Sequence, residues 1–129
     1  MPSESCLQRP PSDLQAAVGE FNRQAFFKCH ETLEALWMGE PGPIRQLYKG
    51  ILQLGVAFYH LQAGRARSAA FLLERASNYL QPFAPHCMGL DLEHLLTRVS
   101  YCLEQVRQYA TGHLDQFDWG CIPQIQMTT

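Results

Sequence analysis

The sequence predicts an all-α fold, a compact single-domain bundle of about five helices whose central helix spans residues 43–63. Three observations support this prediction. Apolar residues recur at helical spacing in each periodic segment, and no segment alternates apolar and polar residues as a half-buried strand does. The chain has 129 residues, near the usual size of one domain, and 47% of them are apolar, which is enough for one core.

The chain divides into three parts. Residues 1–11 are rich in Pro and Ser without periodicity, so we expect a flexible N-terminal arm. Residues 12–112 hold the periodic segments and form the helical domain. Residues 113–129 form a tail with apolar residues but no clear period, and we expect this tail to pack on the bundle or on a partner such as a second copy of the chain.

Caps and turn residues separate the first three helices. Ser12 and Gln15 fit a capping box at the start of the first helix. The second helix ends at Gly39, just before the Pro and Gly residues at 41–43. The third helix begins at Pro43 and is apolar on nearly every side. Such a helix belongs in the centre of a bundle.

The remaining two helices are delimited in the same way. Gly64 ends the third helix, and the fourth is broken by Pro82. Asp91 is the expected N-cap of the fifth helix, which ends at Gly112. Because the connection at Gly64 is short, we expect the third and fourth helices to form an antiparallel hairpin.

A polar cluster interrupts the apolar faces of the second and third helices. His30 lies in the apolar stripe of the second helix, with Glu34 at its edge and Glu31 farther round. Gln53 and His60 are seven residues apart and share one face of the third helix. A buried polar group without a hydrogen bond costs about 1–3 kcal/mol. We therefore expect His30, Glu34, Gln53 and His60 to form a buried network between the two helices, with Trp37 packed at one end.

Two functions are compatible with this cluster. The first is a binding or scaffold module in which the network fixes how the two helices pack. The alternative is a small-ligand or metal-assisted, hydrolase-like enzyme using His30, Glu34 and His60, since imidazole can act as a general base or a metal ligand near neutral pH. The segment His-Glu-x-x-Glu lacks the second histidine of the zinc-protease motif. No cofactor is predicted, and a divalent metal at these three residues belongs to the alternative.

The ordered pattern of these residues resembles the bacterial and plastid family known as domain of unknown function 309. The resemblance runs from about Leu14 to Tyr109 and includes a His-Glu-x-x-Glu-x-x-Trp motif at 30–37. It implies a small all-helical domain without an established activity. The family's signature positions fall on His30, Glu31, Glu34, Trp37, Tyr48, Gln53 and His60. Lys28 departs from the pattern, which often has an acidic residue at this position.

The charge and the apolar runs of the sequence limit the kinds of partner and the compartment that we expect. The net charge is −2 and the ten Lys and Arg residues are scattered, so we expect no nucleic-acid partner. The longest apolar run, Ile51–Leu61, is too short to cross a membrane, which takes roughly 20 residues. The N-terminal sequence shows no export signal, so we expect a cytoplasmic protein whose partner is another protein or a second copy of itself.

Without a Cys-x-x-Cys motif, we expect the five cysteines to be free thiols.

Overall fold

The computed structural model describes residues 4–112 and 117–127, and it confirms the all-α fold. Two-residue strands, β1 and β2, pair between the fourth and fifth helices. The helices and strands are α1 (Ser12–Asn22), α2 (Phe26–Gly39), α3 (Ile44–Gln62), α4 (Ala66–Leu80), β1 (His86–Cys87), β2 (Leu90–Asp91) and α5 (Leu92–Ala110). Short 3-10 turns cover Glu4–Leu7, Gln81–Phe83 and Trp119–Cys121.

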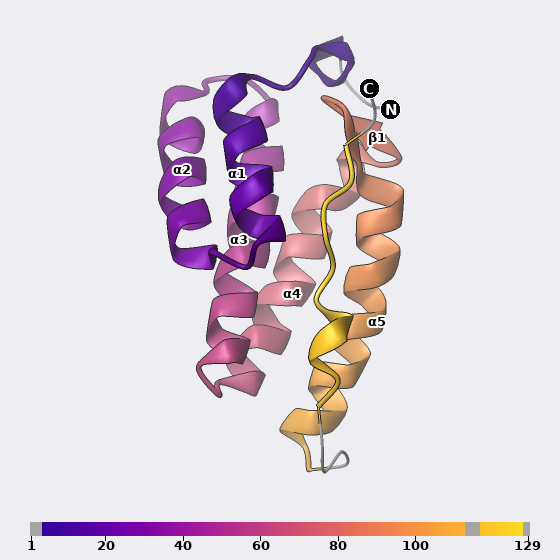
Figure 1. Cartoon of the computed structure of the whole chain (residues 1–129). Coiled ribbons are helices and arrows are strands. Elements are labelled where there is room, and N and C mark those ends of the chain that lie inside the picture. The colour runs from indigo at the N-terminus through magenta and orange to yellow at the C-terminus, as the bar shows by residue number, and fades with distance from the viewer. Residues whose placement is uncertain (1–3, 113–116, 128–129) are drawn as a thin grey trace.

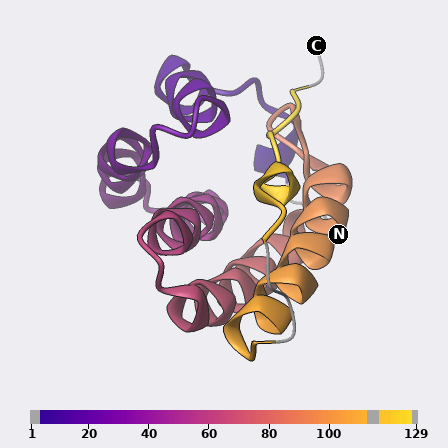
Figure 2. The same cartoon turned by 60° about the horizontal axis from the view of Figure 1, so that its bottom comes forward.

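The five helices follow one another along an arc, each packed against the next (Figures 1 and 2). The central helix of this arc is α3, which packs against α2 on one side and α4 on the other. At the two ends of the arc, α1 and α5 do not pack closely on each other. Residues 117–127 run between α1 and α5 and close the arc, as the end-on view shows (Figure 2).

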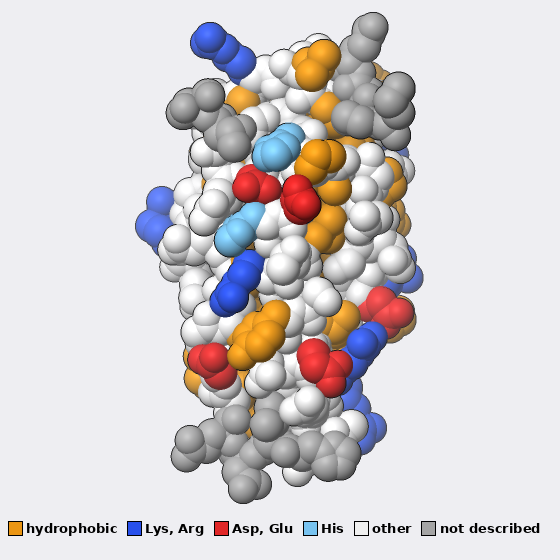
Figure 3. All heavy atoms as spheres, turned by 90° about the vertical axis from the view of Figure 1, so that its right-hand side faces the viewer, with side chains coloured by type: hydrophobic (Ala, Val, Ile, Leu, Met, Phe, Trp, Pro, Cys, Tyr) orange, Lys and Arg blue, Asp and Glu red, His pale blue; other side chains and the backbone are white. Residues whose placement is uncertain are grey.

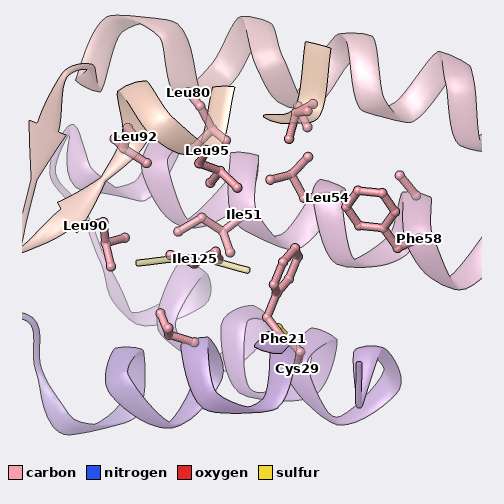
Figure 4. Close-up of a cluster of buried hydrophobic side chains, with 14 of the residues drawn as sticks. Phe21, Cys29, Ile51, Leu54, Phe58, Leu80, Leu90, Leu92, Leu95 and Ile125 are labelled. Atoms are coloured by element: carbon pink, nitrogen blue, oxygen red, sulfur yellow. The ribbon is translucent and has the colours of Figure 1, made fainter. Parts of the chain in front are cut away.

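The core lies on the inner side of the arc, and α3 contributes more buried residues to it than any other helix (Figure 4). Phe21 and Phe58 are fully buried and meet edge to face, with ring centroids 5.9 Å apart. Phe26 contacts both rings. The burial of α3 confirms the central helix that the sequence predicted, since its apolar residues find neighbours on several sides.

The helix ends follow the predicted punctuation in most places. Asp91 caps α5, because its Oδ1 accepts a hydrogen bond from the His94 N–H at 2.9 Å. Gly64, with a φ of 84°, follows the end of α3 in the left-handed conformation that glycine adopts easily. The prediction of a capping box at the start of the first helix was wrong. Its N-cap is Pro11 without a side-chain bond, and the Gln15 side chain instead donates to the carbonyl oxygen of Pro10.

The prediction of five free thiols was wrong for four of the cysteines. Cys6 is bonded to Cys87, and Cys102 is bonded to Cys121, which leaves Cys29 as the free, buried thiol. The first bond ties the N-terminal arm to β1, and the second ties the C-terminal segment to α5. The paired residues are 81 and 19 positions apart, so no local motif could have revealed them.

None of the described helices is both long enough and apolar enough to span a membrane. Residues 117–127 lie on the body of the protein, with Phe117, Cys121 and Ile125 buried. The side chain of Asn22 and the backbone of Ile125 are joined by hydrogen bonds.

Candidate functional site

A small open groove lies between the first turns of α2 and the last turns of α3. It has a volume of about 220 Å³. Two of its aromatic side chains are largely exposed, Phe27 to 66% and Tyr59 to 47%. The lining residues are Phe26, Phe27 and His30 from α2, and Val56, Tyr59 and His60 from α3. The groove therefore combines an apolar wall with two imidazoles from different helices.

His30 is held by the carboxylate one turn farther along its own helix. Its Nε2 lies 2.9 Å from Oε2 of Glu34. The bond to this carboxylate places a proton on Nε2, so the neutral ring carries its lone pair on Nδ1. That Nδ1 atom is buried and has no hydrogen-bond partner. Both ring nitrogens of His30 are thus withdrawn from solvent, one by its bond and the other by burial.

His60 is held by Arg65, which follows the turn at Gly64. The Arg65 Nε–H donates to Nδ1 of His60 at 2.7 Å. Because Nδ1 accepts this bond, the neutral ring carries its proton on Nε2. Burial and then the positive charge of Arg65 hold the pKa of His60 below its ordinary value. At neutral pH His60 is therefore an uncharged ring with one N–H group left to donate.

Gln53 does not complete the network that the sequence predicted. It is only 9% exposed and shares a face of α3 with Val56 and His60, yet its Oε1 is buried without a partner. We expected the side chains to satisfy one another across the two helices. The observed bonds instead stay local, because His30 reaches Glu34 within one helical turn and Arg65 folds back onto His60.

The other predicted site residues lie away from the groove. Trp37 is at the opposite end of α2, where Arg45 and Lys49 of α3 lie over its ring at 4.1 and 4.7 Å from the centroid. Tyr48 is buried near that end, and burial raises its pKa. Glu31 is on the exposed face of α2. The structure therefore divides the predicted cluster into a groove with His30 and His60, a buried Gln53 and a packed Trp37.

The candidate metal ligands do not form a coordination set. In residues 4–112 and 117–127, no three His, Cys, Asp or Glu side chains lie close enough together to hold a metal ion. Glu34 pairs with His30, whereas His60 faces the cation of Arg65. A guanidinium beside a histidine disfavours a divalent cation there.

Sequence reasoning missed five residues of the groove and its surroundings. Phe26 and Phe27 lie four and three residues before His30 on α2, and this spacing is the signal that could have found them. Val56 and Tyr59 belong to the general apolar character of α3, and their spacing to His60 is the signal that could have found them. Arg65 gives no such signal, because its contact with His60 depends on the left-handed turn at Gly64.

Residues 14–72 match the family model of the domain of unknown function DUF309. This part of the chain is similar to that family. The matched region contains most of α1, all of α2 and α3 and the whole groove, and it ends within α4. The match confirms the resemblance seen in the sequence, while the role of individual DUF309 motif residues stays a prediction.

The chain is also similar to the uncharacterized protein YpuF of Bacillus subtilis (strain 168). The two are 34% identical over 84 residues, which cover 63% of this chain. The aligned region is 48% of that protein, so the chain spans about half the length of its curated relative. No solved structure matches the chain. The similarity to DUF309 therefore comes without an activity attached.

Proposed function

We propose that this protein is a binding module that accepts one apolar side chain of a partner protein in the groove between α2 and α3. The groove itself is the observation that carries this proposal. Its volume of about 220 Å³ is below the range of roughly 300–1,000 Å³ that is usual for drug-sized ligands. A single side chain from a partner fits this size better than a cofactor or a large metabolite.

The exposed rings at the groove supply the contact surface. Phe27 and Tyr59 are large, rigid side chains that expose apolar area without a covering element. Aromatic residues of this kind are enriched at the centres of protein interfaces, since they bury much area at a small cost in side-chain entropy. Their position on both sides of the groove favours an inserted side chain flanked by aromatic rings.

His60 adds a polar requirement to the partner. Its Nδ1 is occupied by Arg65, so the ring has one N–H group for a ligand. Arg65 also brings a positive charge to this end of the groove. The preferred partner segment therefore carries a carbonyl or carboxylate oxygen next to its apolar side chain, because such an oxygen accepts the His60 hydrogen bond and is attracted by the guanidinium.

The alternative, an enzyme using His30, Glu34 and His60, has less support in this geometry. A general base needs a lone pair that a substrate proton can reach. The Nδ1 lone pair of His30 is buried, and that of His60 already accepts a bond from Arg65. Neither imidazole is placed to remove a proton from a bound substrate. Binding needs only the apolar lining of the groove and the remaining N–H group of His60.

The partner we propose is a protein or a second copy of the chain, acting in the cytoplasm, and not a nucleic acid. The face on the α5 side supports the last point (Figure 3). Its positive and negative side chains are interspersed with hydrophobic ones, and no continuous positive stripe crosses it. Nucleic acid favours such a stripe.

A titration with small probes tests this function. N-acetyl amides of Leu, Phe and Trp are added to the labelled protein, and amide shifts are followed by two-dimensional NMR. We expect at least one probe to shift the amides of Phe27, Val56 and His60. Phe27→Ala should weaken this binding, and Val56→Phe should abolish it by filling the groove.

Phe71→Ala is the matched control, because Phe71 is similarly exposed at 61% but lies on α4, outside the groove. It should leave probe binding unchanged. The proposal fails if no probe shifts the groove amides, or if both Phe variants change binding equally while circular dichroism shows both folded.

A further inference from the structure

The C-terminal segment is bound to the helices as an extended peptide would be. Asn22, the last residue of α1, contacts one residue of this segment through both ends of its amide. Its Nδ2 donates to the carbonyl oxygen of Ile125 at 3.0 Å, and its Oδ1 accepts from the Ile125 N–H at 2.7 Å. Farther along, the Asp91 N–H donates to the carbonyl oxygen of Gln126 at 2.9 Å. These bonds all engage the backbone of the segment.

The side chains of the segment alternate between core and solvent. Cys121, Pro123 and Ile125 are buried, whereas Gln124 and Gln126 are exposed. Figure 4 places Ile125 within the core cluster, near Ile51 and Leu90. Main-chain hydrogen bonds combined with pockets for alternate side chains are the general means by which proteins bind extended peptides.

The site for this segment is formed by helices at the two ends of the arc. Since α1 and α5 do not pack closely on each other, the segment bridges them (Figures 1 and 2). The helices themselves pack successively from α1 to α5. The segment follows α5 in the chain, and the Cys102–Cys121 disulfide fixes it to that helix at a second point.

We propose that the place between α1 and α5 that residues 121–127 fill is a peptide-binding site with this segment as its built-in occupant, and that cleavage of the Cys102–Cys121 bond lets a partner segment replace it. The partner segment is extended and carries apolar side chains at alternate positions, as residues 121–127 do. This site is separate from the α2–α3 groove and does not depend on the function proposed for that groove.

The cleavage is a thiol–disulfide exchange with a dithiol reductant. A thiolate of the reductant attacks one sulfur, the second reductant thiol resolves the mixed disulfide, and the reductant leaves as its own disulfide. Two electrons and two protons pass to the protein, and Cys102 and Cys121 become thiols. While the bond is intact, it holds the segment at a higher effective concentration than the backbone connection from α5 gives alone, which excludes most competitors.

The bonds of Asn22 explain how a different sequence can use the same site. They read only the N–H and C=O groups of one residue, which every peptide except one with proline at that position provides. Selectivity then comes from the pocket that Ile125 fills. A competitor needs a branched aliphatic side chain at this position and a second apolar one two residues before it.

A binding assay on the full chain tests the proposal. The probe is a fluorescein-labelled peptide with the sequence of residues 117–127 and Ser in place of Cys121. The protein carries Cys121→Ser and Ile125→Asp, so that its own segment lacks the disulfide and cannot fill the pocket. We expect the fluorescence anisotropy of the peptide to rise with one-to-one stoichiometry. Adding Asn22→Ala should weaken binding at least tenfold, and a peptide with Asp in place of Ile125 should not bind.

The matched control protein carries Cys121→Ser and Gln126→Asp, because Gln126 is exposed and its replacement leaves the pocket filled. This protein should bind the peptide at least tenfold more weakly than the Ile125→Asp variant. The proposal is overturned if the folded Ile125→Asp variant ignores the peptide, if Asn22→Ala has no effect, or if the variant forms dimers in place of binding the peptide.

Hydrogen exchange on the otherwise native chain covers the case in which Ile125→Asp does not fold. The Ile125 amide, which donates to Asn22, should exchange at least tenfold faster in Cys121→Ser than in the oxidised native protein, while the core amides of α3 keep their rates. Equal rates at Ile125 in the two proteins would show that the disulfide does not control the segment and would overturn the proposal.

Discussion

Gly50 and Gly55 in α3 provide a sensitive test of the packing, because the same substitution should have opposite effects at the two positions. A Cβ atom at Gly50 would lie 2.7 Å from both Cγ and Cδ2 of Leu80 and 3.1 Å from Cβ of Tyr79. Leu80 is fully buried, so it would have to shift within the core to make room. At Gly55 the nearest atom is Sγ of Cys29 at 4.0 Å, which is ordinary contact.

The magnitudes follow from two opposing effects. Replacing glycine by alanine within a helix stabilises it by roughly 1 kcal/mol. Forcing an extra methyl group into a filled core costs about 1–3 kcal/mol. Gly55→Ala should therefore raise the free energy of unfolding by about 0.5–1 kcal/mol, since only the first effect applies. Gly50→Ala should lower it by about 1–2 kcal/mol, since the clash with Leu80 outweighs the helix propensity.

Urea unfolding followed by circular dichroism measures both variants against the native protein, with an unchanged m value as the sign of a simple stability effect. For a domain of this size, a change of 1 kcal/mol shifts the Tm by roughly 3–6 °C. The double variant Gly50→Ala, Leu80→Ala should be more stable than the two separate effects predict, because the added methyl group partly fills the cavity. The close α3–α4 packing would be refuted if Gly50→Ala stabilised the protein as much as Gly55→Ala.

Three further predictions concern titration, thiol reactivity and the Asn22 contact. Arg65→Ala should raise the pKa of His60 toward the ordinary 6.5, measured by NMR titration, because a neighbouring positive charge is removed. In the native protein the His60 pKa is lower than in the unfolded chain, so its contribution to stability is complete above pH 6.5 and is lost as the pH falls through the folded pKa. Burial raises the pKa of Cys29 to about 12, so iodoacetamide should leave this thiol unmodified in the folded protein. After unfolding without reductant, Cys29 should be the one cysteine that is labelled. Five labelled cysteines in the mass spectrum would contradict both disulfides. Asn22→Ala removes two hydrogen bonds to Ile125 worth about 0.5–1.5 kcal/mol each, so the free energy of unfolding in urea should fall by roughly 1–3 kcal/mol. An unchanged free energy would mean that water replaces both bonds.

The helices could be predicted because each carries its own signals. The third helix was expected over 43–63 and is found as Ile44–Gln62, since Pro and Gly mark its ends and its apolar residues cover nearly every side. Asp91 was recognised as an N-cap from its position just before a periodic stretch. These features depend on residues a few positions apart, which a single sequence displays directly.

The C-terminal segment could not be predicted in the same way. Its buried positions, 121, 123 and 125, do alternate, but two of them are Cys and Pro, which a search for large apolar residues passes over. The segment also makes no strand ladder of its own. Its Ile125 bonds to the side chain of Asn22, more than 100 residues away, and its Cys121 forms a disulfide with Cys102, 19 residues away. Such contacts arise only once the helical arc exists.

The candidate site shows the same division between local and distant interactions. Sequence reasoning placed His30 and His60 between the second and third helices, and they line one groove because both lie on apolar faces that pack together. It did not foresee their hydrogen-bond partners, since a carboxylate one turn away and an arginine beyond a glycine turn were closer than the opposite helix. Helical periodicity determines which face a side chain occupies, whereas the partner depends on backbone turns and side-chain reach.

The two proposed sites use different parts of the fold and depend in different ways on α3. The α2–α3 groove has α3 as one of its walls, so a change in how α3 packs on α4, such as Gly50→Ala, should alter probe binding there. The C-terminal segment is held by α1, β2 and α5, with α3 contributing only core contacts behind it. Gly50→Ala should thus change probe binding in the groove more than hydrogen exchange at Ile125. If both changed together, the arc would be transmitting strain as a single unit and the two sites would be coupled.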